Sequence, residues 1–427
     1  MPTTARAANA ATVLRAVLLH GPVPRIRLAE LSDLSPATVT RLYPPLAERR
    51  LLRELEGPEA GQTLGRPRVP VDLDVSGWVA LGVHLGARRS VVGALDLRGR
   101  LLGAGEVEHE EGAGLQAAIG QACDRLRALH ARVAGRRRVL GLGVITGGRG
   151  DAEAGRPSGQ PGIERPEKDL RAAFARRIGL ASGIGHTGDG GGEDGAAPVG
   201  AASAPTSAPP IFVDEHVRAM ATAESLFGRA KRARSLGYLY VGSDLGFAYS
   251  EDGAVHRGSR AAAGEIAHLP LGLAPQVEGA ALADVAPCTC GSRDCFLALA
   301  GERGVAERAV HLGVVPEPRI DLVLNAARAG DAQAVGLLRD RARNVGSAAA
   351  VLLGILDPEL FVVAGRGLTD AAEYLSDLRA GARERLRGAL PVPIVPTAFG
   401  AQVDAVAAAS VVIDRVVRDP LAVRVPR

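Results

Sequence analysis

The chain has 427 residues, enough for two or three domains with a large buried core. Hydrophobic residues make up 47% of it and charged residues 23%, which excludes a wholly disordered chain. The net charge of +4 is too small to indicate nucleic-acid binding by itself. Because no stretch approaches the roughly eighteen uninterrupted apolar residues of a membrane span, we expect no membrane segment and a cytoplasmic protein.

Residues 1–55 have the apolar spacing of three short helices. The first is predicted over 9–20, and the segment "RIRLAELSDLS" predicts the second. The third opens with Ser35 as its N-cap and Pro36 at its first helical position. The same residues carry eight arginines against four acidic residues, a modest excess that suits contacts to a phosphate backbone.

The third predicted helix has two different faces. Pro44 and Pro45 should kink or shorten it, because proline removes a backbone donor. Its apolar residues, expected to be buried, are Val39, Leu42 and Leu46. Its opposite face and its start carry small and polar side chains: Ser35, Ala37, Thr38, Thr40 and Arg41.

The segment that follows, up to residue 74, has two β-capable ends around a Gly- and Pro-rich loop, as in a hairpin. Three helices and a hairpin are the plan of a winged helix-turn-helix, whose third helix enters the major groove of DNA. The alternative is a small helical cap without a DNA role. In the loop, "GRPR" resembles the minor-groove segment of AT-hook peptides, with Arg66 and Arg68 entering an A·T groove; an arginine-containing linker turn is the other interpretation.

From Trp78 onward, the sequence predicts two α/β series. The strand-like runs "WVALGVHL", "SVVGALDL" and "LLGAGEV" precede a helix over 114–134 and the strand "VLGLGVI". A comparable series later contains "LGYLYVGSDLGFAYS", "LFVVAG" and "VPIVP", with helices near 345–356 and 402–418. Two lobes of mixed sheet with a cleft between them would explain this order. Residues 182–210 cannot bury enough surface to fold and are predicted to be a disordered insertion.

Three of the four cysteines lie within "CTCGSRDC" at 288–295. Clustered thiols in a reducing compartment indicate a metal or catalysis before disulfides. A tetrahedral zinc site needs a fourth ligand, and Cys123 lies in a predicted helix, so we expect a histidine. His268 is the first candidate, and His256 and His311 are weaker ones.

Two other interpretations of the cysteine cluster stay open. Cys290 and Cys295 could form a redox pair, or the three thiols could be unmodified. The glycine after Cys290 and the short turn favour a wrapped metal. Such a zinc site would be structural, because four protein ligands leave no open position for water.

At these residues the sequence resembles the ROK family, which contains sugar kinases and transcriptional repressors. "AGEIAH" followed by "CTCGSRDC" is similar to the family's E-x-G-H and C-x-C-G-x-x-G-C signatures, and "LLGILDPELFVVAGRGL" to its D-P-E segment. The resemblance covers about residues 76–420. It implies an α/β protein with a winged helix-turn-helix in 1–74 and a two-lobed, actin-like ATPase (ROK) domain in 75–427. It also implies a zinc ion held by His268, Cys288, Cys290 and Cys295.

The kinase positions of the family are substituted here. Family kinases cradle ATP phosphate with an Asp-x-Gly-Gly-Thr-like loop, and His84 stands in the place of that Asp. They also carry an Asn-Asp pair before a Glu, and the Asp activates the sugar hydroxyl. With Glu224 aligned on that Glu, Glu215 and His216 occupy the two places; Asp214, one residue away, would miss hydrogen-bond reach of the hydroxyl. The resemblance therefore predicts no catalytic residue and no phosphoryl transfer.

The same substitutions bear on the ligand of the domain. Of the family's sugar-contacting residues only Glu265 is retained, with His268 beside it. The candidate ligand-binding residues are therefore Glu215, His216, Glu265 and His268. They predict a sugar or sugar-phosphate effector, such as an acidic ligand held by His216, or an empty cleft.

The sequence thus predicts a DNA-binding transcriptional regulator, a repressor of carbohydrate-related genes that binds a double-stranded operator as a homodimer or tetramer. One alternative is an active ROK carbohydrate kinase, which an ATPase assay with candidate sugars would reveal. The other is a constitutive DNA-binding protein that uses its ROK domain only for dimerisation. A reporter that responds to no carbon source would support that alternative.

Overall fold

The structure, a computed structural model, divides into two compact units, each described here by itself: residues 1–216 with 404–427, and residues 217–403. The insertion predicted over 182–210 lies outside the described residues up to residue 208, as do Arg66 and Arg68. The described residues are 4–55, 69–86, 88–110, 114–147, 149–151, 156–158, 170–179, 209–272, 286–369, 371–388, 390 and 392–425.

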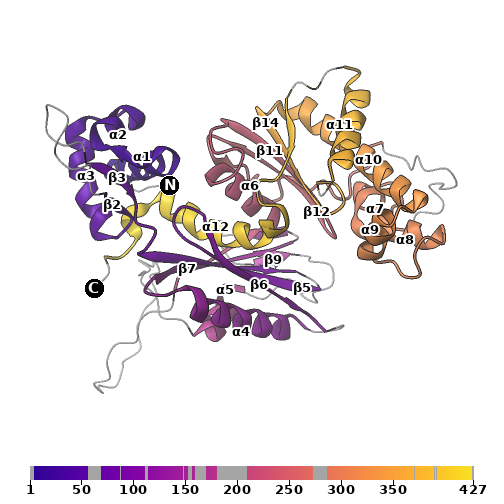
Figure 1. Cartoon of the computed structure of the whole chain (residues 1–427), viewed down its shortest axis with the longest axis horizontal. Coiled ribbons are helices and arrows are strands. Elements are labelled where there is room, and N and C mark those ends of the chain that lie inside the picture. Colours follow the sequence, from indigo (N-terminus) through magenta and orange to yellow (C-terminus); the bar gives the residue numbers. More distant parts are fainter. Residues whose placement is uncertain are drawn as a thin grey trace. The chain divides into compact units, whose positions relative to one another are not determined.

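The first unit begins with a small domain of three helices and a three-stranded sheet (Figure 1). In the sheet, β3 pairs antiparallel with both β1 and β2. The three predicted helices and the hairpin are confirmed, whereas a strand of two residues such as β1 carries no periodicity that a sequence could reveal. The elements are α1 (Ala5–His20), β1 (Val23–Pro24), α2 (Arg25–Ser32), α3 (Pro36–Glu48), β2 (Leu52–Glu54) and β3 (Pro70–Leu73).

Helix α3 begins at the predicted residue. The Ser35 side chain accepts a hydrogen bond from the backbone N–H of Thr38 at 3.1 Å, and Pro36 is the first helical residue. This cap satisfies one of the donors that a helix start leaves free. The three residues predicted to be buried on this helix, Val39, Leu42 and Leu46, are at most 3% exposed.

The proline pair does not end α3, which continues to Glu48. Without N–H groups, Pro44 and Pro45 leave the carbonyls one turn earlier, those of Thr40 and Arg41, without helical donors. Both of these residues are exposed, so water can satisfy their carbonyls.

The rest of the first unit is built on a five-stranded sheet with the order β10-β7-β4-β5-β6. Strands β4, β7 and β10 are parallel, and β5 and β6 are antiparallel additions. The elements are β4 (Trp78–Leu85), β5 (Arg89–Leu95), β6 (Leu101–Glu108), α4 (Leu115–Val133), β7 (Arg138–Thr146), β8 (Arg149–Asp151), β9 (Arg156–Ser158), α5 (Leu170–Ile178) and β10 (Ile211–Glu215).

Helices cover both faces of this sheet. Helices α4 and α5 share a hydrophobic core with the strands. The predicted C-terminal helix, α12 (Val403–Arg418), lies on the other face and is followed by the turn η3 (Pro420–Ala422). A Cβ atom added at Gly143 would lie 1.9 Å from the Ala408 carbonyl oxygen, and one added at Gly82 would lie 2.3 Å from the Ala409 nitrogen. The helix backbone therefore touches the sheet backbone directly.

Several hydrogen bonds fasten the N-terminal domain to this sheet. The Trp78 indole N–H donates to the Arg49 carbonyl at 2.8 Å, and the Arg49 guanidinium donates to the Leu421 carbonyl at 3.2 Å. The Arg50 guanidinium donates to the hydroxyl of Ser76, just before β4, at 3.2 Å. The domain is thus held both by the first strand of the sheet and by the chain that follows α12.

The second unit contains a sheet with the order β13-β12-β11-β14-β15. Two antiparallel and two parallel pairings recur in the same sequence as in the first unit, so the sheet is repeated as in an actin-like ATPase fold. The strands are β11 (Ser235–Val241), β12 (Leu245–Glu251), β13 (Ala254–Val255), β14 (Leu360–Ala364) and β15 (Ile394–Pro396).

Helix α10 is longer than the sequence pattern predicts. It starts at Ala332 rather than near 345, because Asp331 caps it by accepting a hydrogen bond from the Ala334 N–H at 2.8 Å. Among the described residues, every helix is too short or too polar to span a bilayer. The helical elements of this unit are α6 (His216–Leu226), α7 (Phe296–Ala300), α8 (Glu302–His311), α9 (Ile320–Arg328), α10 (Ala332–Leu356), α11 (Ala372–Leu386) and η2 (Gly400–Gln402).

We predict that Gly143→Ala lowers the free energy of unfolding by about 3 kcal/mol, because its new methyl group meets a carbonyl oxygen that cannot move alone. Gly336→Ala is the matched control. It lies inside α10 with open space around its Cβ position, and it should raise stability by about 1 kcal/mol. Urea unfolding of both variants checks this, and equal effects would contradict the close contact of α12.

Candidate functional sites

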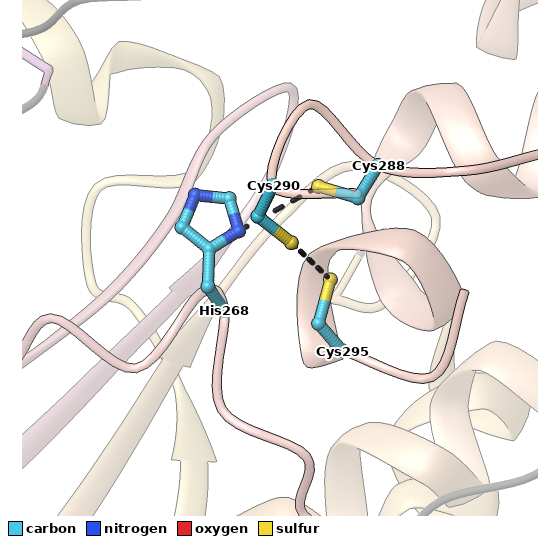
Figure 2. Close-up of side chains that lie close together, drawn as sticks. All are labelled: His268, Cys288, Cys290 and Cys295. Atoms are coloured by element: carbon cyan, nitrogen blue, oxygen red, sulfur yellow. Dashed lines mark hydrogen bonds between the residues drawn. The ribbon is translucent and has the colours of Figure 1, made fainter. Parts of the chain in front are cut away.

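Four potential metal ligands gather in the second unit: His268, Cys288, Cys290 and Cys295 (Figure 2). Their ligand atoms all lie within 4.8 Å of one another. The His268 Nδ1 is 3.5 Å from the Cys288 Sγ, and the Sγ atoms of Cys290 and Cys295 are 3.8 Å apart. This last distance excludes a disulfide, whose sulfurs are about 2.05 Å apart. Cys290 and Cys295 are therefore both free thiols in this structure.

The backbone brings the two halves of this cluster together. The N–H of Phe296 donates to the Leu269 carbonyl at 3.1 Å, and the N–H of Leu297 donates to the Ala267 carbonyl at 2.7 Å. These two bonds lie on either side of His268 and directly after Cys295. They set the histidine beside the cysteines although twenty residues separate it from the first of them in sequence.

Two glycines shape the chain around the cluster. Gly291 has a φ of 87° in the turn where its N–H donates to the Cys288 carbonyl. Gly264 has a φ of 90°, and a Cβ there would lie 1.7 Å from the Phe247 carbonyl oxygen. A side chain at either position would be strained, and at Gly264 it would also push the "GEIAH" segment off β12.

The donor set fits a tetrahedral metal ion. In a tetrahedral site, zinc–sulfur bonds of about 2.3 Å place two sulfur atoms about 3.8 Å apart. The Sγ atoms of Cys290 and Cys295 are separated by 3.8 Å. Burial, and then the neighbouring thiols, raise the pKa of Cys295 to about 12. A bound cation would therefore be needed to keep all three sulfurs as thiolates.

A second cluster of charged residues lies in the first unit, at the end of β4. The His84 Nδ1 is 3.4 Å from one Asp404 carboxylate oxygen, and Arg89 is 3.8 Å from the other. The His84 and His216 rings are 5.7 Å apart between centroids. His216 in turn has its Nδ1 3.2 Å from the Glu215 carboxylate. The residues at the two substituted kinase positions thus face one another in this unit.

Asp404 is the centre of this cluster and only 7% exposed. Its burial alone would raise the pKa of its carboxyl, but His84, with further contributions from His216 and Arg89, outweighs burial and holds that pKa below the usual value. Asp404 stands in the first turn of α12, and no local pattern in the sequence connects it to β4.

The structure also describes the other residues named by the sequence. Asp214 is buried, and its carboxylate accepts a hydrogen bond from the Glu215 N–H at 2.8 Å. Glu224 is fully buried, with hydrogen bonds from Thr397 and from two backbone N–H groups. Glu265 is exposed in the second unit. Of the candidate ligand-binding residues, Glu215 and His216 belong to the first unit and Glu265 and His268 to the second.

A buried arginine joins the loops at the carboxyl ends of β11 and β14, where α/β sheets usually bind ligands. The Arg341 guanidinium donates to the carbonyls of Val241, Ala300 and Arg366 at 2.5–3.0 Å. Burial lowers its pKa to about 10, so it remains charged at neutral pH. The Arg366 side chain pairs with Glu302 at 3.4 Å. Charged residues of the chain itself therefore occupy this end of the sheet.

The start of α3 is exposed, as a DNA-reading face must be. The Thr40 hydroxyl donates to the Pro36 carbonyl at 2.9 Å, and the Thr38 hydroxyl is 2.8 Å from that of Ser35. Arg41 makes no hydrogen bond or ion pair with any residue that the structure describes, so its guanidinium is available to a partner. The fully exposed members of the predicted set are Ser35, Ala37, Thr40 and Arg41, and Thr38 is half-buried.

Comparison with known proteins identifies the family. The ROK family matches residues 201–415. The transcriptional regulator Rv0485 of Mycobacterium tuberculosis is 33% identical over 96% of this chain and 86% of its own length. The transcriptional dual regulator NagC of Escherichia coli is 25% identical over 90% and 87%. The chain therefore belongs to the ROK family, and these relatives along nearly its whole length are transcriptional regulators.

Solved structures agree with this assignment. A ROK family transcriptional regulator, a homologue of the E. coli Mlc protein, covers 97% of this chain and 98% of its own at a TM-score of 0.72 and 21% identity, which confirms the fold. A ROK hexokinase from Thermus thermophilus covers 79% of this chain and 99% of its own at a TM-score of 0.58 and 25% identity. The match to the regulator covers 97% of this chain, so it includes the N-terminal domain as well as the ROK domain.

We predict that Asp404→Asn makes stability less dependent on pH in acid. The folded-state pKa of Asp404 is lowered, so its contribution to stability is present above the unfolded value of about 3.9 and is lost as pH falls through the folded value. One such group adds up to about 1.4 kcal/mol per pH unit to the slope with which the free energy of unfolding falls in acid. Urea unfolding from about pH 3 to pH 6 measures this loss. An unchanged slope in Asp404→Asn would contradict the pairing with His84.

Proposed function

We propose that the protein regulates transcription by binding a double-stranded DNA operator through α3, as a repressor of carbohydrate-related genes. The observation that carries this proposal is the exposed, Ser35-capped start of α3 in a three-helix, three-strand domain fastened to the first sheet. The domain boundary at 74/75 is part of the proposal. Relatives of this chain are named as transcriptional regulators, which supports the proposed DNA-binding function.

In this proposal the first residues of α3 face base edges in the major groove. Ala37 is small enough to approach a thymine methyl group, and Arg41 can reach a guanine or a phosphate. Arg66 and Arg68 would enter the minor groove beside it. Because operators of this class are two-fold, we propose a homodimer or tetramer acting in the cytoplasm.

We propose that His268, Cys288, Cys290 and Cys295 hold a structural zinc ion. The distances within the cluster support this, as does the mixed histidine and cysteine donor set that zinc prefers. Four protein ligands leave no site for a reacting water, so the ion would tie the His268 segment to α7 and take no part in catalysis. If one ring nitrogen of His268 binds zinc, only its other ring nitrogen could contact an effector.

We propose that the kinase-like domain transfers no phosphoryl group. The Asp404 carboxylate between His84 and Arg89 supports this, because a phosphoryl group there would meet a buried negative charge. The contacts of Arg341 and Arg366 in the second unit support it too. An ATPase assay with a panel of sugars tests this point, and turnover would return the kinase alternative.

A sugar or sugar-phosphate effector is the second part of the proposal. A relative from Escherichia coli O6:H1 is named an N-acetylglucosamine repressor, and the ROK hexokinase shares the fold, which supports a carbohydrate ligand for Glu215, His216, Glu265 and His268. A ligand regulates only if it binds two states of the protein with different affinity. Calorimetry with sugars and sugar phosphates measures this, and absence of heat would favour the constitutive alternative.

Genome-wide occupancy of the tagged protein on several carbon sources tests the whole proposal. A palindromic motif beside sugar-transport genes, lost on one carbon source, is the expected result. Occupancy that never changes would support constitutive binding. No enriched site at all would refute the DNA-binding function.

We predict that Arg41→Ala and Arg66→Ala each weaken binding to duplexes recovered by that experiment by roughly five- to thirty-fold, because each loses about 1–2 kcal/mol of DNA contact. Fluorescence anisotropy at physiological salt measures the change. Arg6→Ala in α1 removes the same charge from the same domain and is the control. Equal affinity of Arg41→Ala and Arg6→Ala would reject α3 as the reading helix.

We predict that the purified protein contains one zinc ion per chain by mass spectrometry, and that Cys290→Ser loses it. A strong chelator should lower the melting temperature of the wild type and leave that of Cys290→Ser unchanged, because metal binding contributes directly to folding. Cys123→Ala, a buried cysteine outside the cluster, should keep its zinc. Equal metal content in the wild type and Cys290→Ser would exclude this site.

A further inference from the structure

A basic surface covers one face of the first unit. Residues 115–138 and 170–178, which form α4, α5 and the turn after α4, hold nine arginines and one acidic residue, Asp124. The whole chain is nearly balanced, with 51 basic and 47 acidic residues. The excess is therefore local and not a consequence of composition.

Some of these arginines pair within the chain, and others have no partner among the described residues. Asp124 pairs with Arg127. Arg132, Arg136 and Arg176 make no hydrogen bond or ion pair with any residue in the described part of the chain. The exposed arginines, which we call the α4–α5 surface, are Arg127, Arg132, Arg136, Arg138, Arg176 and Arg177.

The acidic residues of the neighbouring edge strand point away from this surface. In β6, Cβ atoms added at Gly103 and Gly105 would meet Leu129 and Arg125 of α4. Because side chains alternate along a strand, Glu106 and Glu108 face the opposite side of the sheet. Among the described residues, these two glutamates and the arginines of the α4–α5 surface thus lie on opposite faces of the sheet.

The surface reaches the foot of the N-terminal domain. The Arg137 guanidinium donates to the Val75 carbonyl at 3.0 Å, and the Arg138 N–H donates to the Gly77 carbonyl at 3.1 Å. Val75 and Gly77 belong to the segment that leads from β3 to β4, where Trp78 bonds to the residue after α3. This position therefore favours the partner that we propose for α3, which is duplex DNA.

We propose that the α4–α5 surface binds the phosphates of DNA flanking the site that α3 reads. This rests on the proposed DNA-binding function. Helix α4 is about 28 Å long, which along duplex DNA spans many phosphates spaced about 1.7 Å apart along the axis. Arginines at this spacing release counterions and add affinity without reading sequence. The sheet domain of the first unit thereby extends the DNA contact beyond the N-terminal domain.

The test compares Arg132→Gln/Arg136→Gln/Arg176→Gln with a control of equal charge in the second unit, Arg260→Gln/Arg383→Gln/Arg387→Gln, whose arginines are also exposed. The probes are duplexes of about 20 and about 60 base pairs centred on the site that the wild type recovers from genomic DNA. Titrations over a range of salt concentrations give affinity and its salt dependence.

We expect the α4–α5 variant to bind the long duplex on the order of tenfold more weakly and the short duplex almost normally, with a salt slope smaller by about 2–3 on the long duplex. The control should match the wild type. Equal affinity of the variant and wild type for the long duplex would overturn the proposal while leaving DNA regulation intact. So would tighter wild-type binding to single-stranded RNA or to an acidic polypeptide than to duplex DNA. Failure of the wild type to recover any duplex would instead refute the proposed function itself.

Discussion

The direct contact of α12 with the glycines of the first sheet is the constraint on which this unit depends. Without side chains at Gly82, Gly93 and Gly143, the backbone of α12 can lie against three neighbouring strands. This closeness puts Asp404, at the start of the helix, beside His84. It also brings the chain after the helix to Arg49, at the end of α3. Helix α12 and the chain that follows it therefore connect the charged cluster with the DNA-binding domain.

Features that are local in sequence could be predicted from it. The Ser35-Pro36 start of α3 and its buried face follow from capping and periodicity, and both are present. Helix α12 follows from its amphipathic pattern. By contrast, the first half of α10 contains one glycine and three arginines, which blur its apolar period, and its start depends on one capping residue, Asp331. Helix α7 has only five residues and carries no such pattern, whereas the buried residues of α9, Ile320, Val323 and Leu324, recur at helical spacing and could have been used to predict it.

The candidate sites were predictable only where residue type was decisive. The cysteine spacing indicates a metal, but His256 and His311 offer the same donor chemistry as His268. The backbone bonds of residues 267–269 to 296–297 make the choice, and sequence does not contain them. In the same way, the substitution of His84 is visible in the sequence, whereas its partner Asp404 comes from the far end of the chain. Long-range pairing of this kind follows from topology, which no local pattern encodes.

The charged clusters explain why a kinase-like fold suits a regulator. Phosphoryl transfer uses positive charge to hold a phosphate, and here carboxylates of the chain lie beside two of its arginines: Asp404 beside Arg89, and Glu302 beside Arg366. Regulation needs no transfer, only a difference in ligand affinity between states. A ligand that competes with Asp404 for His84 would act on the first turn of α12. The chain after α12 accepts a hydrogen bond from Arg49, at the end of α3. Such a ligand would therefore also change the stability of the contact that holds the DNA-binding domain. The substitutions at the kinase positions thus leave α12 connected to the charged cluster and, through the chain that follows it, to the N-terminal domain.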